Sequence, residues 1–195
     1  IFDATKEWAA PFNTGEVDLD YWIEDFIDIV LNSILDFSIK SKDRVRILKA
    51  SDMVEPNVVA YVLKQDDNIN SKVKGKFYAY EAIQAAKNEN VEWCILTDGY
   101  KWRLYNTDTI SPYEQYLEID IEESLKKNKA DSTFILYVNF FNKNNFTFDK
   151  DNNLRIDKKL EESNKKISQI EDHLKEKAEL ILNDLCNGFK ENMNF

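Results

Sequence analysis

The chain has 195 residues, of which 43% are hydrophobic, so it can bury one sizeable core, and its length favours a single domain over two. Its formal net charge of -10 counts against a protein that coats nucleic acid non-specifically, because phosphate binding depends on lysine and arginine displacing counterions. No apolar stretch approaches the roughly 20 residues that a helix needs to cross a bilayer, and the amino-terminal residues do not resemble a secretory leader. The cysteines, Cys94 and Cys186, have no spacing typical of a zinc site. We therefore expect a cytoplasmic protein with no membrane partner.

The first half of the chain predicts a helix, two strands, a loop and a second helix. Apolar residues recur at helical spacing over residues 19–35, which predicts a helix buried on more than one side. The apolar, β-branched runs 44–48 and 58–63 predict two strands that turn-forming residues separate. The polar stretch 65–71 predicts an exposed loop. Small residues at helical spacing over 77–86 then predict a helix that lies close against a sheet.

A strand, a tight turn and a second strand are predicted over 93–97, 98–99 and 101–105. A helix over 119–127 and a strongly apolar strand over 134–141 follow. Strands that alternate with helices are typical of an α/β or α+β fold, in which helices flank a central mixed sheet.

The end of the chain predicts one long amphipathic helix over residues 157–189. Its apolar residues lie near heptad spacing between charged residues, and Gly188 is a plausible C-cap. We therefore predict one domain over 1–156, followed by a helix within 157–195 that either packs on it or leads to a further domain.

Basic residues alternate along two short segments: Lys40, Lys42, Arg44 and Arg46 in the first, and Lys72, Lys74 and Lys76 in the second. On an extended chain, alternate side chains point to the same face. Each set is either a solvated face or a rim that contacts phosphate groups. For the second interpretation, all of these residues except Lys40 are candidates for binding nucleic acid.

One part of the chain resembles a known protein family. Residues 81–86 (EAIQAA) and 93–105 (WCILTDGYKWRLY) look like a stretch of type I restriction R subunits and of fused restriction-methylation enzymes. In those proteins a helix that opens with Gln-Ala leads to an apolar strand, then to Thr-Asn-Gly and to Trp-x-x-Tyr. The resemblance implies a restriction-endonuclease-like domain of the PD-(D/E)xK type, acting in DNA restriction-modification and phage defence. It also implies DNA as a partner, and a methyltransferase or motor domain or subunit.

The chemistry that this resemblance implies requires paired carboxylates. Nucleases of the family hold a divalent metal between an Asp on one strand and an Asp or Glu on the next, and a lysine two residues later helps to activate water. Mg²⁺ would be the cofactor, because it takes oxygen ligands. In one register, Val62-Leu63-Lys64 stands in place of Glu-x-Lys, Lys64 is the catalytic lysine, and Asp43 or Asp52 is the catalytic acid and metal ligand.

In a second register, Asn57 takes the place of the first acid and Asn70 that of the glutamate, so both carboxylates become amides. The first register is preferred, because the family's Glu-x-Lys strand is apolar and central, as 58–63 is and 66–71 is not. Glu81 stands where the family has glutamine. It is either a helix-entry acid or a carboxylate that reaches the site.

Three functions follow. The chain is a Mg²⁺-dependent site-specific endodeoxyribonuclease of type I or II, whose catalytic residues are Lys64 with Asp43, Asp52 or Glu81. Alternatively, it is a DNA-binding remnant of such an enzyme that needs no cofactor. The third hypothesis is a non-catalytic scaffold that binds a partner subunit.

Overall fold

The structure is a computed structural model that describes residues 26–50, 55–64, 67–73, 75–127 and 130–192. The chain divides into two compact units, residues 1–147 and residues 148–195. The predicted acid Asp52 and the predicted phosphate-binding Lys74 lie outside the described residues.

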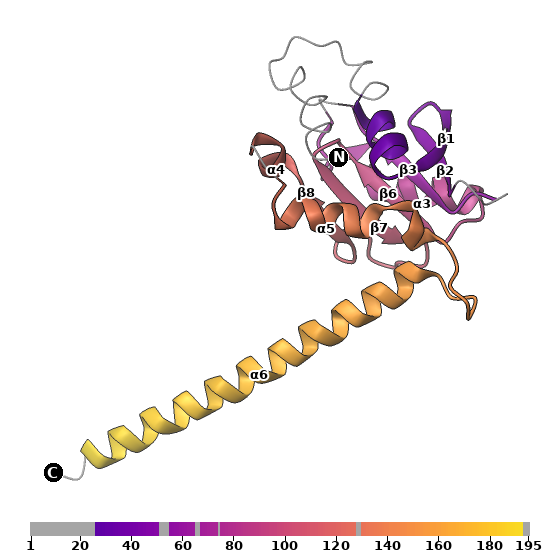
Figure 1. The fold of residues 1–195 in the computed structure, drawn as a ribbon. Coiled ribbons are helices and arrows are strands. Elements are labelled where there is room, and N and C mark those ends of the chain that lie inside the picture. Colours follow the sequence, from indigo (N-terminus) through magenta and orange to yellow (C-terminus); the bar gives the residue numbers. More distant parts are fainter. Residues whose placement is uncertain (1–25, 51–54, 65–66, 74, 128–129, 193–195) are drawn as a thin grey trace. The chain divides into compact units, whose positions relative to one another are not determined.

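The first unit is built on a six-stranded mixed sheet with the strand order β1-β2-β3-β6-β7-β8 (Figure 1). Its strands are β1 (Phe37–Lys42), β2 (Val45–Ala50), β3 (Val58–Val62), β6 (Trp93–Thr97), β7 (Lys101–Asn106) and β8 (Leu117–Asp120). Neighbouring strands are antiparallel except β3 and β6, which are parallel. A separate two-stranded hairpin pairs β4 (Lys72–Val73) with β5 (Lys76–Phe77). The predicted α/β fold with a central mixed sheet is therefore confirmed.

Helix α3 (Tyr78–Asn88) covers one face of this sheet, against β3 and β6. Because β3 and β6 are parallel, the chain must return to the starting end of the sheet between them, and α3 makes that crossover. Ala79, Ala82 and Ala86 are buried against the sheet, as the small-residue pattern predicted. Small side chains allow a helix to approach a sheet closely, which explains the choice of alanine.

The opposite face is covered by three other segments: the helical residues 26–34, which include the π-helical turn η2 (Val30–Ile34), helix α5 (Ser132–Phe141) and the short 3₁₀ helix η3 (Lys143–Phe146). Trp102 of β7 is fully buried, and its ring centroid lies 5.1 Å from that of Tyr137 and 5.9 Å from that of Phe141. Phe37 of β1 contacts Phe146 in the same way. Aromatic contacts therefore join the sheet to the helices on this face.

The prediction of a strand over 134–141 is wrong, because this segment is helix α5. Phe134, Tyr137 and Phe141 recur at helical spacing and are buried, whereas Ile135 is 54% exposed. The Asp131 side chain caps the helix by accepting a hydrogen bond from the Phe134 N–H over 3.0 Å. A run that is apolar in every position carries neither period clearly, so its spacing could not distinguish a helix from a strand.

The boundaries of the neighbouring elements also differ from the prediction. The helix expected over 119–127 is shorter, because 117–120 pairs with β7 as strand β8 and only α4 (Glu122–Lys126) is helical. The segment expected to be an exposed loop, 65–71, contains Ile69, which is only 3% exposed. That isoleucine belongs to the core beneath α3, so the loop is fastened to the sheet.

The second unit consists mainly of α6 (Arg155–Asn192), the predicted long carboxy-terminal helix. The helix continues through Gly188, so the prediction that this glycine ends it is wrong. Before α6, the Asp149 carboxylate accepts hydrogen bonds from the Asp151 and Asn153 N–H groups, which lower the pKa of Asp149. The large exposed apolar residues of α6 are Ile167, Ile170, Leu174, Leu180, Ile181 and Leu182. None of the helices in the described ranges has the length and apolar character that a membrane span requires.

Candidate functional site

Several of the predicted site residues, among them Asp43 and Lys64, lie at one end of the six-stranded sheet. Strand β3 ends at Val62 and the parallel strand β6 ends at Thr97, so we call this end the carboxyl edge. Tyr61 of β3 pairs with Val45, the first residue of β2, so the turn between β1 and β2 lies beside the end of β3. Helix α3 starts near the same edge, because it returns the chain to the beginning of β6. Open α/β sheets commonly bind ligands at the carboxyl ends of their strands.

A carboxylate with three hydrogen-bond donors occupies this edge. Asp67 accepts bonds from Arg44 Nη1 and from the Tyr78 hydroxyl, each over 2.7 Å, and from the Lys64 N–H over 3.0 Å. We call Arg44, Asp67 and Tyr78 the Asp67 cluster. Burial by itself would raise the pKa of Asp67, but the hydrogen bonds from Tyr78, Lys64 and Arg44 outweigh burial and lower it. Asp67 is therefore held as a carboxylate that already accepts three hydrogen bonds from the protein.

Tyr61 lies next to the Asp67 cluster, and two of the predicted acids, Asp43 and Glu81, influence its pKa. Its ring centroid is 6.3 Å from that of Tyr78. Burial raises the pKa of Tyr61, Arg44 lowers it, and the carboxylates of Glu81, Asp43 and Asp67 raise it further. The structure therefore brings Asp43 and Glu81, which are 38 positions apart in the sequence, into the electrostatic surroundings of one hydroxyl group.

The described residues at this edge do not fit a Mg²⁺ ion. The Val62 N–H donates to the Arg44 carbonyl over 2.8 Å, so the valine that takes the place of the family's glutamate lies beside an arginine, which follows the predicted acid Asp43 in the sequence. A guanidinium repels a divalent cation, and a valine offers no oxygen ligand. Within the described ranges, no group of three or more His, Cys, Asp or Glu side chains could hold a metal ion. Lys64, the catalytic lysine of the first register, lies two residues after the end of β3, and its side chain is exposed.

The second register does not bring its residues together. The Asn57 side chain accepts a hydrogen bond from the Ala50 N–H over 2.9 Å, at the start of β3 and therefore at the other end of that strand from the carboxyl edge. Asn70, its intended partner, accepts a hydrogen bond from Arg103 Nη2 over 2.7 Å. Both amides thus have structural roles in separate places.

Arg103 was not among the predicted site residues, although it organises the neighbouring part of the same face. It is 6% exposed, its Nε lies 2.5 Å from Glu118 Oε2, and its guanidinium lies 4.4 Å from the Tyr116 ring centroid. Together with the Asn70 bond, these contacts tie β7, β8 and the loop before β4 to one another. The sequence signal for this role is that Arg103 is charged but stands between apolar residues of the predicted strand 101–105.

Two of the predicted phosphate-binding residues, Arg44 and Arg46, have carboxylate partners within the protein. Arg46 is 3% exposed and its Nε lies 2.7 Å from Asp28 Oδ1, so it is part of the core and does not face a phosphate. Arg44 is engaged in the Asp67 cluster. The expectation of one exposed face also fails because a turn separates Lys42 in β1 from Val45 in β2.

Four of the predicted lysines do have exposed side chains. We call them the edge lysines: Lys42, Lys64, Lys72 and Lys76. Lys42 ends β1 and Lys64 follows β3 at the carboxyl edge, while Lys72 and Lys76 lie on the β4–β5 hairpin that leads directly into α3. Within the described residues, no carboxylate forms an ion pair with any of the four. The Lys72 ammonium lies 4.9 Å from the Phe77 ring centroid, a contact that leaves its charge uncompensated.

Comparisons with protein-family models, with curated proteins and with solved structures found no match to this chain.

Proposed function

We propose that this chain carries a restriction-endonuclease-like domain that binds DNA and does not cut it. The order of its elements supports the resemblance: a helix, three antiparallel strands, the crossover helix α3 and the parallel strand β6. The segment that resembles restriction enzymes most specifically, residues 93–105, forms β6, a tight turn and β7. Its turn is fixed by hydrogen bonds from the Lys101 and Tyr100 N–H groups to Asp98 Oδ1.

The observation that carries the proposal is the set of edge lysines. Lysines that neutralise phosphate groups release condensed counterions, and this release supplies most of the affinity of non-specific DNA binding. The net charge of -10 means that an unpaired basic region is a local exception on this chain. An exposed ammonium group that has no carboxylate partner among the described residues can accept a phosphate without breaking an ion pair within them.

Two positions argue against cleavage. Val62 stands where the first register places the family's glutamate, and Arg44 brings a guanidinium to the same end of the sheet, where three donors already bind the Asp67 carboxylate. A DNA duplex that lies along the edge lysines would meet a guanidinium and a buried aliphatic side chain in place of a metal site. The domain would thus bind DNA as a nuclease does, but it could not activate a water molecule for cleavage.

The test is a salt titration of binding to labelled duplex DNA by fluorescence anisotropy. Wild type should show a log-log slope that reflects several phosphate contacts, and Lys64→Ala should reduce the magnitude of that slope by about 0.9. Lys87→Ala is the matched control, because Lys87 is exposed near the far end of α3. Equal slopes for the two variants would contradict a phosphate contact by Lys64. No binding at any salt concentration would contradict DNA binding and leave the partner-subunit scaffold.

A second assay separates binding from cleavage. Supercoiled plasmid is incubated with the protein and Mg²⁺ or Mn²⁺, alongside Lys64→Ala, Asp43→Asn, Asp52→Asn and Glu81→Gln. We expect no metal-dependent nicking by any of these proteins. Nicking by wild type that one of the variants abolishes would instead establish a Mg²⁺-dependent nuclease and identify its acid.

A further inference from the structure

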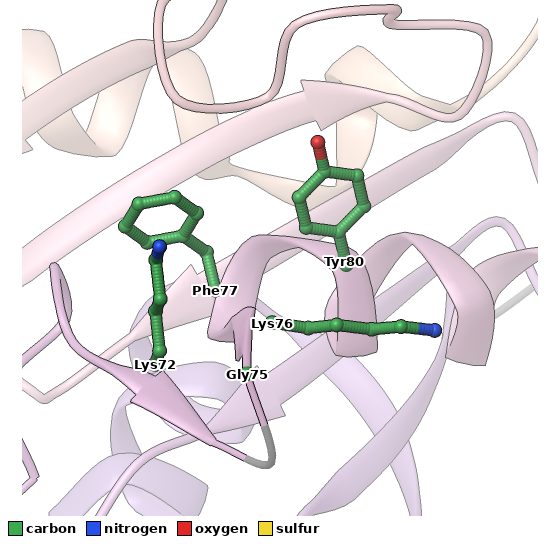
Figure 2. A pocket seen from close by; sticks show the side chains of 5 residues that line it. All are labelled: Lys72, Gly75, Lys76, Phe77 and Tyr80. Atoms are coloured by element: carbon green, nitrogen blue, oxygen red, sulfur yellow. The ribbon is translucent and has the colours of Figure 1, made fainter.

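An open pocket lies between the β4–β5 hairpin and the start of α3, apart from the Asp67 cluster. It has a volume of about 430 Å³ and is lined by Lys72, Gly75, Lys76, Phe77 and Tyr80 (Figure 2). This volume falls within the range of roughly 300–1,000 Å³ that is usual for small-molecule sites. No acidic residue is among the described residues that line it, although the chain has 36 Asp and Glu against 26 Lys and Arg.

The local backbone explains how these side chains meet. Gly75 has a φ of 82°, a conformation that residues with a side chain rarely adopt, and it allows the chain to turn between β4 and β5. The turn pairs Lys72 with Phe77 across the hairpin. Phe77 is extended, and α3 begins immediately after it, so Tyr80 comes from the first turn of the helix. A hairpin and a helix start thus present two aromatic and two basic side chains together.

The two aromatic side chains differ in how they are held. The Phe77 ring has the Lys72 ammonium 4.9 Å from its centroid and the Tyr113 ring centroid at 6.2 Å, so these two contacts restrict its motion. Tyr80 is 39% exposed, whereas its neighbours Tyr78 and Ala79 are buried in the core. Figure 2 shows the Tyr80 ring standing beside the pocket, with the Lys76 side chain running past its base.

This combination selects a particular kind of ligand. Exposed aromatic faces stack on flat, apolar rings, and ammonium groups bind phosphate. A simple anion would gain nothing from the rings, and a purely apolar ligand would gain nothing from the lysines. A nucleobase whose phosphate lies one sugar away uses both features. A base within a duplex has its faces covered by its neighbours, so it could not stack here.

We propose that this pocket binds an unpaired nucleotide of a DNA strand, with its base against Tyr80 and neighbouring phosphates of the strand on Lys72 and Lys76. The proposal rests on the proposed DNA-binding function and adds a preference for single-stranded DNA. The edge lysines serve any DNA backbone, whereas the pocket serves only a base that is not stacked on its neighbours.

The experiment measures the affinity of the full chain for a labelled thymidine oligonucleotide about 12 nucleotides long and for a labelled hairpin duplex. Tyr80→Ala should weaken binding of the single strand by about 5- to 150-fold, the effect of losing one stacked base, and change duplex binding by less than about twofold. Tyr80→Phe should retain the affinity, because it keeps the ring. Phe148→Ala is the control, since Phe148 is a similarly exposed aromatic residue in the second unit.

Each outcome decides between the proposals. If Tyr80→Ala and Lys76→Ala leave single-strand affinity unchanged while the duplex is still bound, the pocket proposal is overturned and the proposed function stands. Absence of binding to either DNA overturns both. Thymidine 5′-monophosphate is added as a competitor. If it displaces the oligonucleotide at a concentration equal to the oligonucleotide's own Kd, the ligand is a free nucleotide and the proposed preference for a strand is wrong.

Discussion

Arg46 Nε donates a hydrogen bond to Asp28 Oδ1 over 2.7 Å, and this ion pair joins the second strand of the sheet to the helical segment that precedes β1. The Arg46 side chain is only 4% exposed, and it also donates through Nη1 to the carbonyl of Asp43. The arginine therefore holds the turn between β1 and β2 from inside. Its role is to position the carboxyl edge, not to bind a ligand there.

Arg46→Ala should lower the free energy of unfolding by about 1–3 kcal/mol, because it removes a buried, hydrogen-bonded guanidinium and leaves the partly exposed Asp28 carboxylate without its partner. Urea denaturation followed by circular dichroism measures the loss. Lys40→Ala is the control, since Lys40 is exposed on the adjacent strand and should change stability by less than about 0.5 kcal/mol. Similar small losses for both variants would mean that the buried pair contributes little.

Asp67→Asn should lower the free energy of unfolding at neutral pH by about 1–3 kcal/mol. The amide cannot attract Arg44 as a carboxylate does, so the guanidinium loses its charged partner. Thermal and urea unfolding provide the measurement, and Asp108→Asn is a matched control at an exposed position in the turn after β7. A variant as stable as wild type would show that the Asp67 cluster does not hold the edge together.

The same carboxylate predicts how stability depends on pH. Asp67 has a lower pKa in the folded protein than its ordinary value of 3.8, so its contribution is fully present above that value and is lost as the pH falls through the folded-state pKa. The difference in unfolding free energy between wild type and Asp67→Asn should therefore be constant near neutrality and shrink below about pH 4. Urea midpoints measured from neutral to acidic pH test this. If the difference between wild type and Asp67→Asn stays the same at every pH, this prediction is contradicted.

Tyr137→Phe should stabilise the protein, by about 1 kcal/mol. Tyr137 is fully buried between Trp102 and Phe141, and its hydroxyl has no hydrogen-bond partner within the described residues. Removing that oxygen ends the cost of burying it and leaves the ring contacts in place. Tyr113→Phe, at a residue 53% exposed, is the control and should have almost no effect. A destabilised Tyr137→Phe would show that the hydroxyl is satisfied.

The sequence alone determined much of the regular structure. The small residues at helical spacing over 77–86 identify α3. The apolar run that ends at Asp98-Gly99 identifies β6 and, after the turn, β7. Each of these elements depends on the spacing of residues close together in the chain. The long helix α6 follows from the same kind of local pattern. Local spacing failed at 134–141, where uniform apolarity concealed the period, and Phe134, Tyr137 and Phe141 took the helical spacing that buries them.

The arrangement of the site was decided only by the tertiary structure. Arg44, Asp67 and Tyr78 lie in a turn, a loop and a helix, and no spacing in the sequence links them. The pairing of Val45 with Tyr61 and the crossover through α3 bring them within hydrogen-bonding distance. The basic residues illustrate the same division. Their alternation predicted that each segment presents a basic face, but Arg46 is buried and both Arg46 and Arg44 pair with carboxylates, so neither adds to the free surface charge. Which charges remain unpaired depends on contacts between distant segments, and these exist only once the chain has packed.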